Sequence, residues 1–394
     1  MKKTWRWFGK NDKITLPILK QIGVEGVVTA LHHIPNGEIW KLTDILNLKE
    51  YIESAGLLWS VVESLPVSEA IKYGGENIDH LIDNYIQSLA NLGEAGITTV
   101  CYNFMPVIDW IRTDLVHPWA DGTSSLYFDK IRFAYFDCMI LEREGAEKDY
   151  TDEEMSKVHE LNKTISEKEK DTLIDTIIVK TQGFVNGNIK EGDKNPVSIF
   201  KNLLALYDGI DRNQLRENMK YFLTRLMPVC EEYNINMCVH PDDPPYQMLG
   251  LPRIVTSGED IDWILNAVNN PYNGLTFCAG SLSSGIHNNV PELARKFASR
   301  TRFVHLRSTD ILPNGNFIEA PHLEGRGHLI ELVRIFEKEN PSLPMRVDHG
   351  RLMLDDADKE YNPGYSFYGR MYALAQMDGV IETIKDELKH NINI

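Results

Sequence analysis

The chain has 394 residues, of which 43% are hydrophobic and 25% are charged, a composition typical of a globular protein with a substantial core. Its formal net charge of −16 and its pI near 5.2 argue against nucleic acid as a partner, because binding a phosphate backbone requires a basic surface. We also expect no membrane association, since no stretch approaches the roughly 18 consecutive apolar residues of a membrane span.

The N-terminal stretch and the cysteines favour a cytoplasmic location. The first residues, MKKTWRWFGKNDK, include two lysines but lack the apolar segment of a secretory signal. The five cysteines, at positions 101, 138, 230, 238 and 278, are odd in number and form no CxxC pair. This pattern fits a reducing compartment better than a disulfide framework.

Strand and helix patterns alternate in the first quarter of the chain. Short runs rich in aromatic or β-branched residues predict strands at 4–9, 24–31, 58–62 and 98–104. Between them, apolar residues at helical spacing predict helices at 16–22, 41–55 and 78–92. The order strand, helix, strand is typical of parallel βα units.

The alternation stops between about residues 106 and 234. Residues 131–141 are apolar enough for a strand or a buried helix, and the pattern does not decide between them. Residues 142–171 are dense in Glu and Lys, which is typical of solvated helices, and 197–233 have helical spacing. We interpret this block as an insertion after the fourth strand, helical over 140–215, that covers one face of the domain.

The alternation resumes in the last third of the chain. Strands are predicted at 236–240, 274–278, 302–306 and 345–348, and helices at 258–268, 290–299, 328–339 and 367–390, with a long loop after residue 306. Four strands before the insertion and four after it predict an α/β fold, a (β/α)8 TIM barrel formed by residues 1–394 as a single domain. The alternative is an open doubly wound sheet, but no Gly-rich phosphate turn follows any predicted strand.

Four successive predicted strands end in residues that commonly bind metals. These strands are MCVH, LTFC, RFVH and MRVD, which end at His240, Cys278, His305 and Asp348. A single histidine or cysteine at a strand end is more often a buried core residue. In a barrel, however, the carboxyl ends of the strands face one another. We therefore predict that the four side chains bind one divalent metal ion.

The ligand types narrow the choice of ion. Two imidazoles, a thiolate and a carboxylate suit Mn²⁺, Fe²⁺ or Zn²⁺ better than Mg²⁺ or Ca²⁺. Manganese normally prefers more oxygen ligands, so the thiolate of Cys278 leaves iron or zinc open.

The segment after the last strand adds three candidates for chemistry. His349 is either a general acid or base beside the metal or a residue that orients Asp348. Arg351 either binds a substrate carboxylate through two hydrogen bonds or pairs with an acidic side chain. Tyr365 follows Pro363 and Gly364 in a loop, where a phenol can exchange a proton or simply pack.

Polar residues elsewhere are candidates for contacts with a substrate. Those that end the first four strands are Arg6, His32, Glu63 and Asn103, and we assign substrate binding to Arg6 and Asn103 among them. The turn after His240 carries Asp242 and Asp243, and the long loop after His305 carries Arg307, Glu319 and His322. Of the loop residues, Arg307 is assigned to substrate binding.

The sequence resembles the D-mannonate dehydratase family, whose barrel is similar to that of xylose isomerase. The resemblance spans nearly the whole chain and rests on TWRWFG, GVVTALHHIP, VVESLPV, YNFMPVIDW, HPDDPP, GLPRI, GSLSSG, FVHLR, VDHGR and the PGY at 363–365. It implies a hydro-lyase that removes water from D-mannonate to give 2-keto-3-deoxy-D-gluconate in hexuronate breakdown. The block at about 140–215 resembles the helical insertion of longer members and is not expected to take part in the chemistry.

The resemblance also implies roles for individual residues. The family's metal ligands fall on His240, Cys278, His305 and Asp348, the set already suggested by the strand ends. Its catalytic pair falls on His349 and Tyr365, and its usual metal is Mn²⁺ or Fe²⁺, with Zn²⁺ left open. Which of the two catalytic residues is the base and which the acid stays undecided from the sequence.

Two other functions are compatible with the pattern. A metal-dependent sugar isomerase on the same barrel would normally carry more carboxylate ligands. A sugar-acid-binding module would keep the substrate contacts but need no acid–base pair. A homodimer is expected only because dimers are the commonest closed oligomers.

Overall fold

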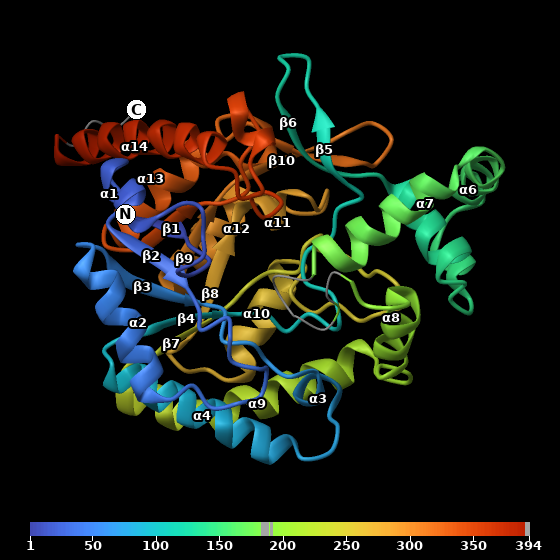
Figure 1. Ribbon diagram of the computed structural model, residues 1–394. Helices are drawn as coiled ribbons and strands as arrows, with labels where there is room; N and C mark the ends of the chain where they lie inside the picture. Colours follow the sequence, from blue (N-terminus) through green and yellow to red (C-terminus); the bar gives the residue numbers. More distant parts are fainter. Residues whose placement is uncertain (183–188, 190–191, 391–394) are drawn as a thin grey trace.

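Eight parallel strands close into a barrel at the centre of the molecule (Figure 1). The computed structural model describes residues 1–182, 189 and 192–390. The barrel order is β1-β12-β9-β8-β7-β4-β3-β2, which confirms the predicted TIM barrel. Its strands are β1 (Lys2–Arg6), β2 (Gly26–Thr29), β3 (Leu58–Glu63), β4 (Thr99–Tyr102), β7 (Asn236–Val239), β8 (Asn273–Cys278), β9 (Thr301–Leu306) and β12 (Pro344–Val347).

Helices cover the outside of the barrel, so strands are buried on both faces. All four residues of β2 are buried, for example. In α4, Ile82, Leu89 and Leu92 are buried at helical spacing, which explains why this segment forms an amphipathic helix. The helices that follow the strands are α1 (Leu16–Gln21), α2 (Leu42–Ser54), α3 (Glu69–Tyr73), α4 (Ile78–Glu94), α9 (Arg212–Tyr233), α10 (Gly258–Ala267), α11 (Ala279–Ser283), α12 (Val290–Phe297), α13 (Leu329–Glu339) and α14 (Tyr368–Lys389).

Two hydrophobic clusters form the core. The large one lies between strands and helices. The small one is the plug of the barrel and consists of Val28, Val61, Cys101 and Phe303. Burying side chains of this size contributes about 1.5–3 kcal/mol each, so the plug fixes the strands whose ends carry the polar residues described below.

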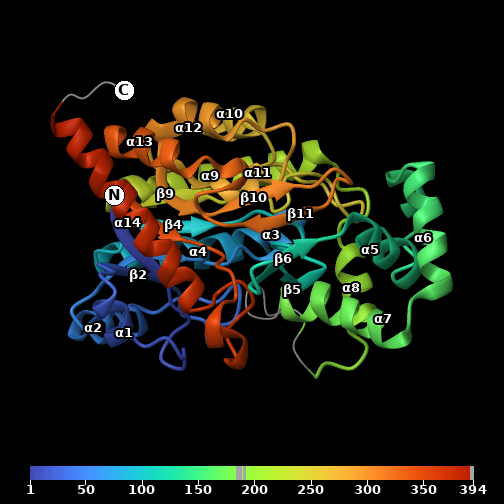
Figure 2. The ribbon, with the colours of Figure 1, turned by 90° about the horizontal axis from the view of Figure 1, so that it is seen from above.

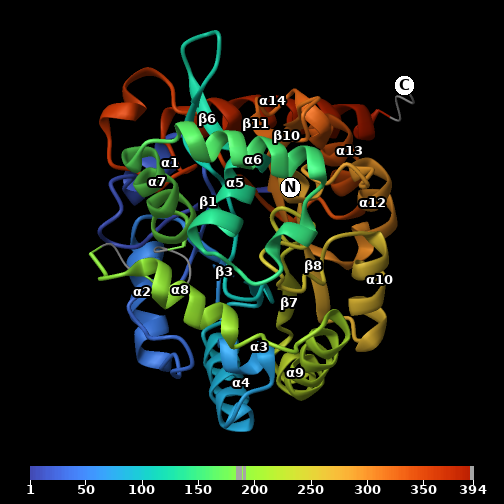
Figure 3. The same cartoon turned by 90° about the vertical axis from the view of Figure 1, so that its right-hand side faces the viewer.

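The block after the fourth strand lies between β4 and the barrel helix α9, and its helices project to one side (Figures 1, 2 and 3). Its elements are β5 (Asp114–Pro118), β6 (Ser124–Phe128), α5 (Lys130–Tyr135), α6 (Asp152–Thr164), α7 (Glu167–Ile174) and α8 (Pro196–Ala205). The segment 131–141, undecided from the sequence, is helical as far as Ile140. Capping boxes begin α6 at Thr151 and α7 at Ser166, which explains why this charged stretch is helical.

A four-stranded antiparallel sheet, absent from the sequence prediction, joins two loops at the carboxyl end of the barrel. Its order is β10-β11-β6-β5. The expected long loop after residue 306 is instead the hairpin of β10 (Ser308–Ile311) and β11 (Phe317–Ala320). The hairpin β5–β6 of the insertion pairs with β11, so that Ile318 lies opposite Tyr127. The insertion after β4 therefore contains strands as well as helices.

Several predicted strands end one or more residues early. Strand β12 ends at Val347 and β7 at Val239, so Asp348 and His240 begin the loops at the barrel mouth. No helix in the described ranges combines the length and the apolar character that crossing a bilayer requires.

Candidate functional site

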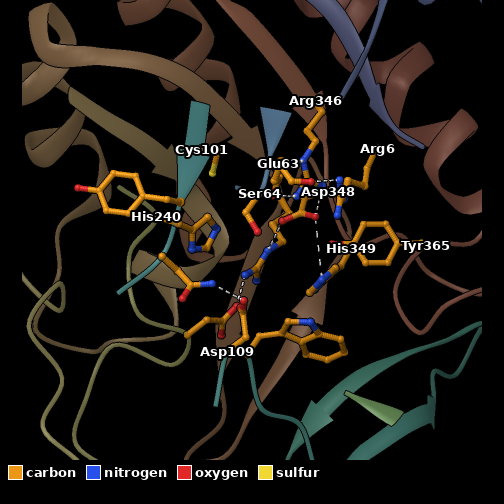
Figure 4. A pocket seen from close by; sticks show the side chains of 15 residues that line it. Arg6, Glu63, Ser64, Cys101, Asp109, His240, Arg346, Asp348, His349 and Tyr365 are labelled. Carbon is orange, nitrogen blue, oxygen red and sulfur yellow. Dashed lines mark hydrogen bonds and ion pairs between the residues drawn. The ribbon is translucent and has the colours of Figure 1, made fainter. Parts of the chain in front are cut away.

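A cavity opens at the carboxyl ends of the barrel strands (Figure 4). Its lining comes from the ends of several barrel strands and from the loops that follow them. The lining residues are Arg6, Glu63, Ser64, Cys101, Tyr102, Asn103, Asp109, Trp110, His240, Asp243, Arg307, Arg346, Asp348, His349 and Tyr365. Nine of the residues singled out by the sequence as ligands, catalytic groups or substrate contacts are in this set: Arg6, Glu63, Asn103, His240, Asp243, Arg307, Asp348, His349 and Tyr365.

Three of the four predicted metal ligands meet beside this cavity. Ligand atoms of His240, Cys278 and His305 all lie within 4.8 Å of one another. The Nδ1 of His240 donates to the carbonyl of Pro241 (2.7 Å), because a carbonyl only accepts. In the neutral imidazole the lone pair of His240 is then on Nε2, which lies 3.2 Å from Nδ1 of His305. Burial lowers the pKa of His240, but the Cys278 thiolate outweighs this effect and raises the pKa to about 9, so a metal ion at Nε2 would replace a proton. This orientation of an imidazole by its second nitrogen is typical of metal ligands.

The side chain of Cys278 is ionised, as that of a cysteine metal ligand must be. Burial raises its pKa, but the Arg307 guanidinium and His240 outweigh this effect and hold the pKa well below the usual range. The thiolate, not the thiol, binds metals. A thiolate and two imidazoles within reach of one atom suit a divalent ion of the borderline class.

Asp348, the fourth predicted ligand, lies at the edge of this triad. Its Oδ2 is 3.6 Å from Nδ1 of His305 and accepts a hydrogen bond from Nε of Arg307 (2.9 Å). Its Oδ1 accepts from Arg346. Burial opposes ionisation, but Arg346 together with His349 holds the pKa of Asp348 well below its usual range, so the carboxylate is charged.

A second group of possible ligands shares His305. Atoms of Glu63, Cys101 and His305 also lie within 4.8 Å of one another. Burial and the Glu63 carboxylate raise the pKa of Cys101 well above its usual range, so its thiol keeps the proton. Both oxygens of Glu63 accept from Arg346, at 3.1 and 3.0 Å. The protonated thiol makes this the poorer set of donors, because the thiolate is the form that binds metals.

His349 and Tyr365 lie together on one side of the cavity, with His240 on the other (Figure 4). Their rings meet edge to face, with centroids 5.3 Å apart and an interplanar angle of 87°. The close approach of His349 requires a glycine at 364, where φ is +83° and a Cβ would lie 2.7 Å from Cδ2 of the imidazole. Burial and the Asp348 carboxylate raise the pKa of Tyr365, so its phenol is protonated at neutral pH.

Positive charge surrounds the carboxylates of the site. Arg307 contacts Asp348, Glu319 and Asp243, and each of these side chains is almost fully buried. Arg6, by contrast, donates to the backbone carbonyl of Glu63. Such buried networks cost desolvation energy and are poor devices for stability alone, which favours a functional role.

Arg351 lies outside the cavity. Its Nη1 donates to Oδ2 of Asp121 (2.8 Å) and to Oγ1 of Thr123 (3.0 Å), in the turn between β5 and β6. The structure therefore gives Arg351 the alternative considered from the sequence, an ion pair with an acidic residue, and its position does not support contact with the substrate.

Four other candidates are also absent from the cavity lining. The cavity lining does not include His32, Asp242, Glu319 or His322. Asp242 is held by Val255 N (2.8 Å) and by Arg253. The turn after His240 is thus divided, because Asp243 lines the cavity and Asp242 fixes the chain beside it.

Sequence reasoning missed Arg346, Asp109 and Trp110. The signal for Arg346 was available, because alternation along β12 places it on the same face as Asp348, two residues later. Asp109 and Trp110 lie in an irregular loop, where no periodicity predicts direction. Asp109 accepts from Nδ2 of Asn103 (2.6 Å), and burial, opposed by His240, raises its pKa.

Comparisons with known proteins agree with this geometry. A family model described as D-mannonate dehydratase (UxuA) matches residues 1–391. The chain is 44% identical to a mannonate dehydratase of Marinomonas sp. strain MWYL1, over 98% of this chain and 100% of the relative. It is 43% identical to that of Chromohalobacter salexigens, over 98% and 99%.

The chain is also similar to solved structures. The crystal structure of mannonate dehydratase from Streptococcus suis serotype 2 is similar, with a TM-score of 0.79 and 33% identity over 98% of this chain and 96% of that one. A xylose isomerase domain protein from Planctomyces limnophilus has a TM-score of 0.51 at 8% identity, covers 99% and 98% of the two chains, and shares the fold. The chain belongs to the D-mannonate dehydratase family.

Proposed function

We propose that this chain is a hydro-lyase that removes water from D-mannonate to give 2-keto-3-deoxy-D-gluconate, with His349 and Tyr365 as its catalytic pair. The observation that carries the proposal is a cavity lined by His240, His349 and Tyr365, with ligand atoms of Cys278 and His305 within 4.8 Å of that of His240. Family membership over residues 1–391 supports the same reaction.

The proposed cofactor is Mn²⁺ or Fe²⁺, held by His240, Cys278 and His305, with Asp348 as the fourth ligand. The donor set fits either ion and also Zn²⁺, since two imidazoles and a thiolate lie together and the Asp348 carboxylate lies 3.6 Å from His305. When bound, a divalent ion supplies a Lewis acid that stabilises the negative charge developing beside the substrate carboxylate.

The protonation states suggest how the catalytic pair divides its work. The proton on C2 is weakly acidic and must be taken by a base, and the hydroxyl on C3 leaves as water once it receives a proton. Because its pKa is raised, the phenol of Tyr365 carries its proton at neutral pH, so we assign it to the C3 hydroxyl. His349 then takes the C2 proton, and the resulting enol tautomerises to the 2-keto acid.

Three cavity residues are proposed to bind the substrate. Arg307 and Asn103 line the wall, each already oriented by a carboxylate. Arg6 donates to a backbone carbonyl rather than a carboxylate, so its guanidinium is the best suited to a substrate carboxylate. The homodimer and the cytoplasmic location remain predictions from the sequence.

Turnover of D-mannonate by variants of the pair tests the proposal. His349→Asn and Tyr365→Phe should each lower kcat by about 10²–10⁴-fold, because each removes one proton-transfer group. The metal content should not change. The assay follows the 2-keto-3-deoxy acid, beside aldose–ketose interconversion for the isomerase alternative.

A matched control is Tyr361→Phe, which removes a phenol from the same loop but outside the cavity lining. It should keep near-normal turnover. Variants of His349 and Tyr365 that turn over normally with metal bound would show the assignment to be wrong, and isomerase activity in place of dehydration would refute the reaction.

A further inference from the structure

Glu319 is a buried carboxylate at the mouth of the barrel that the proposed reaction does not yet use. It lies in β11, in the small antiparallel sheet, and is 2% exposed. Its Oε1 accepts from Nδ1 of His349 (3.1 Å) and from Nη1 of Arg307 (2.9 Å), and it also pairs with Arg112. Glu319 thus connects the catalytic histidine to a pair of buried cations.

The charge on Glu319 decides which nitrogen of His349 carries a proton. Burial raises the pKa of Glu319, but Arg307 and Arg112 outweigh it and bring the pKa to about 2. An ionised carboxylate only accepts hydrogen bonds, so Nδ1 of His349 must be the donor. In the neutral imidazole the lone pair is then on Nε2, the nitrogen that lies 4.0 Å from Oδ1 of Asp348.

The imidazole is also held by packing. Trp110 lies with its ring centroid 4.9 Å from that of His349, and Tyr365 meets its edge. Gly364 closes the same side, since a Cβ there would overlap the ring. These contacts restrict tilt, and the hydrogen bond to Glu319 restricts rotation of the ring about its bond to Cβ.

The two arginines have other acidic partners. Arg112 also donates to Asp243 (2.9 Å), and Arg307 also contacts Asp243 and Asp348. The contacts described for Nδ1 of His349, in contrast, are with Glu319. Neutralising the arginines therefore does not by itself account for the position of Glu319.

We propose that Glu319 is a positioning residue for the dehydration: it accepts the Nδ1–H of His349 and so presents Nε2 to the cavity as the proton acceptor. The inference rests on the proposed function, because it gives His349 the role of base. No atom of Glu319 needs to touch the substrate.

Two variants of Glu319 distinguish the effect of its position from the effect of its charge. Glu319→Asp keeps the charge that the arginines need but withdraws the carboxylate by about 1.5 Å, so the contact with His349 is lost. Its kcat should fall by roughly 10²-fold, with KM changed by no more than about twofold. Glu319→Gln keeps the reach and an acceptor oxygen, and should retain more of kcat than Glu319→Asp. If Glu319→Asp is the more active variant, Glu319 acts on the arginines by charge and the proposal is wrong.

A double variant asks whether Glu319 acts through His349. In the His349→Asn background, Glu319→Asp should change the residual kcat by less than about twofold, because the residue it positions is gone. An equal loss of about 10²-fold in both backgrounds would overturn the proposal. Failure of the wild-type chain to dehydrate D-mannonate would instead refute the proposed function, so the two failures are distinguishable.

Asp137→Asn is the matched control for weakening a buried ion pair. Asp137 is fully buried and accepts from Nε and Nη2 of Arg143 (2.8 and 2.7 Å), far along the chain in the insertion. This variant should lose thermal stability and keep kcat. If it loses as much kcat as Glu319→Asp, the effect at Glu319 is one of general stability and the proposal fails.

Discussion

Two buried cysteines in the barrel have thiols of opposite proton affinity. Cys278 lies next to Arg307 and His240, which stabilise its thiolate. Cys101 lies in the apolar plug, beside the Glu63 carboxylate, where burial and like charge favour the neutral thiol. Both are close enough to His305 to be ligands, so charge rather than distance distinguishes them.

Serine variants of these cysteines test which of the two groups of possible ligands binds the metal ion. Cys278→Ser should weaken metal binding by more than the roughly 10–100-fold that contacts outside the ligand shell contribute, because a serine hydroxyl stays protonated. Cys101→Ser should keep its metal. Elemental analysis after dialysis against a known metal concentration measures both. Loss of metal from Cys101→Ser alone would contradict the assignment and favour the set with Glu63.

Single residues were predictable where a strand fixed their direction. Strand ends in a barrel converge, which is why His240, His305 and Asp348 could be placed near one another from the sequence. Arg351 was not predictable, because it lies beyond the strand and its partner, Asp121, is 230 positions away. Loop direction depends on such distant contacts, which no local pattern encodes.

At the scale of elements, the insertion contacts the site although the family resemblance implies no part in the chemistry. Gln182, two residues after the helical segment Asp175–Lys180, is buried. Its Nε2 donates to the carbonyl of Trp110 (2.9 Å), and its Oε1 accepts from N of Asp109 (2.9 Å). One side chain thus fixes the loop that presents two cavity residues.

Replacing Gln182 tests this contact. Gln182→Ala removes three hydrogen bonds, with Asp109, Trp110 and Thr181, worth about 0.5–1.5 kcal/mol each, and frees the loop of Asp109 and Trp110. We expect a free energy of unfolding lower by about 1.5–4.5 kcal/mol and a several-fold loss of kcat/KM. Denaturant unfolding and steady-state kinetics measure the two effects. Gln87→Ala, in an exposed i,i+4 contact of α4, is the control, and equal kinetics for both variants would contradict the role of Gln182.

Long periodic elements were predictable and the small sheet was not. Amphipathic spacing predicted α4 and α13 to within two residues at each end. The short helices α3 and α11 were not predicted, and the helical stretch expected over 197–233 is divided into α8 and α9. The strands β6 and β11 have five and four residues, and their register pairs Phe128 with Phe317. Strands so far apart in the chain pair because of tertiary packing, and a short sequence window contains no information about that packing.

Over the whole molecule, a strongly acidic chain surrounds a site in which charges of both signs are paired. The net charge is −16, yet fully buried arginines, among them Arg112, Arg307 and Arg346, meet around the cavity. Their carboxylate partners come from strands and loops that are distant in sequence, including Glu63, Asp243, Glu319 and Asp348. Burying such a network costs free energy, and the closed barrel holds it in place.

The barrel itself followed from counting alternating elements, because eight βα units have few other ways to bury their strands on both faces. The positions of the paired charges could not be predicted by counting strands and helices. Their arrangement depends on which loops cross the barrel mouth, and the hairpin β10–β11, which supplies Glu319, was expected to be a loop.

The central claim, a metal-dependent dehydratase, is tested most directly by turnover of D-mannonate after removal and return of metal. The chain is treated with a chelator, dialysed, analysed for residual metal, and assayed with Mn²⁺, Fe²⁺ or Zn²⁺ added back. We predict that the 2-keto-3-deoxy acid stops forming on chelation and forms again with Mn²⁺ or Fe²⁺. Undiminished turnover by protein that contains far less than one metal ion per chain would contradict the account.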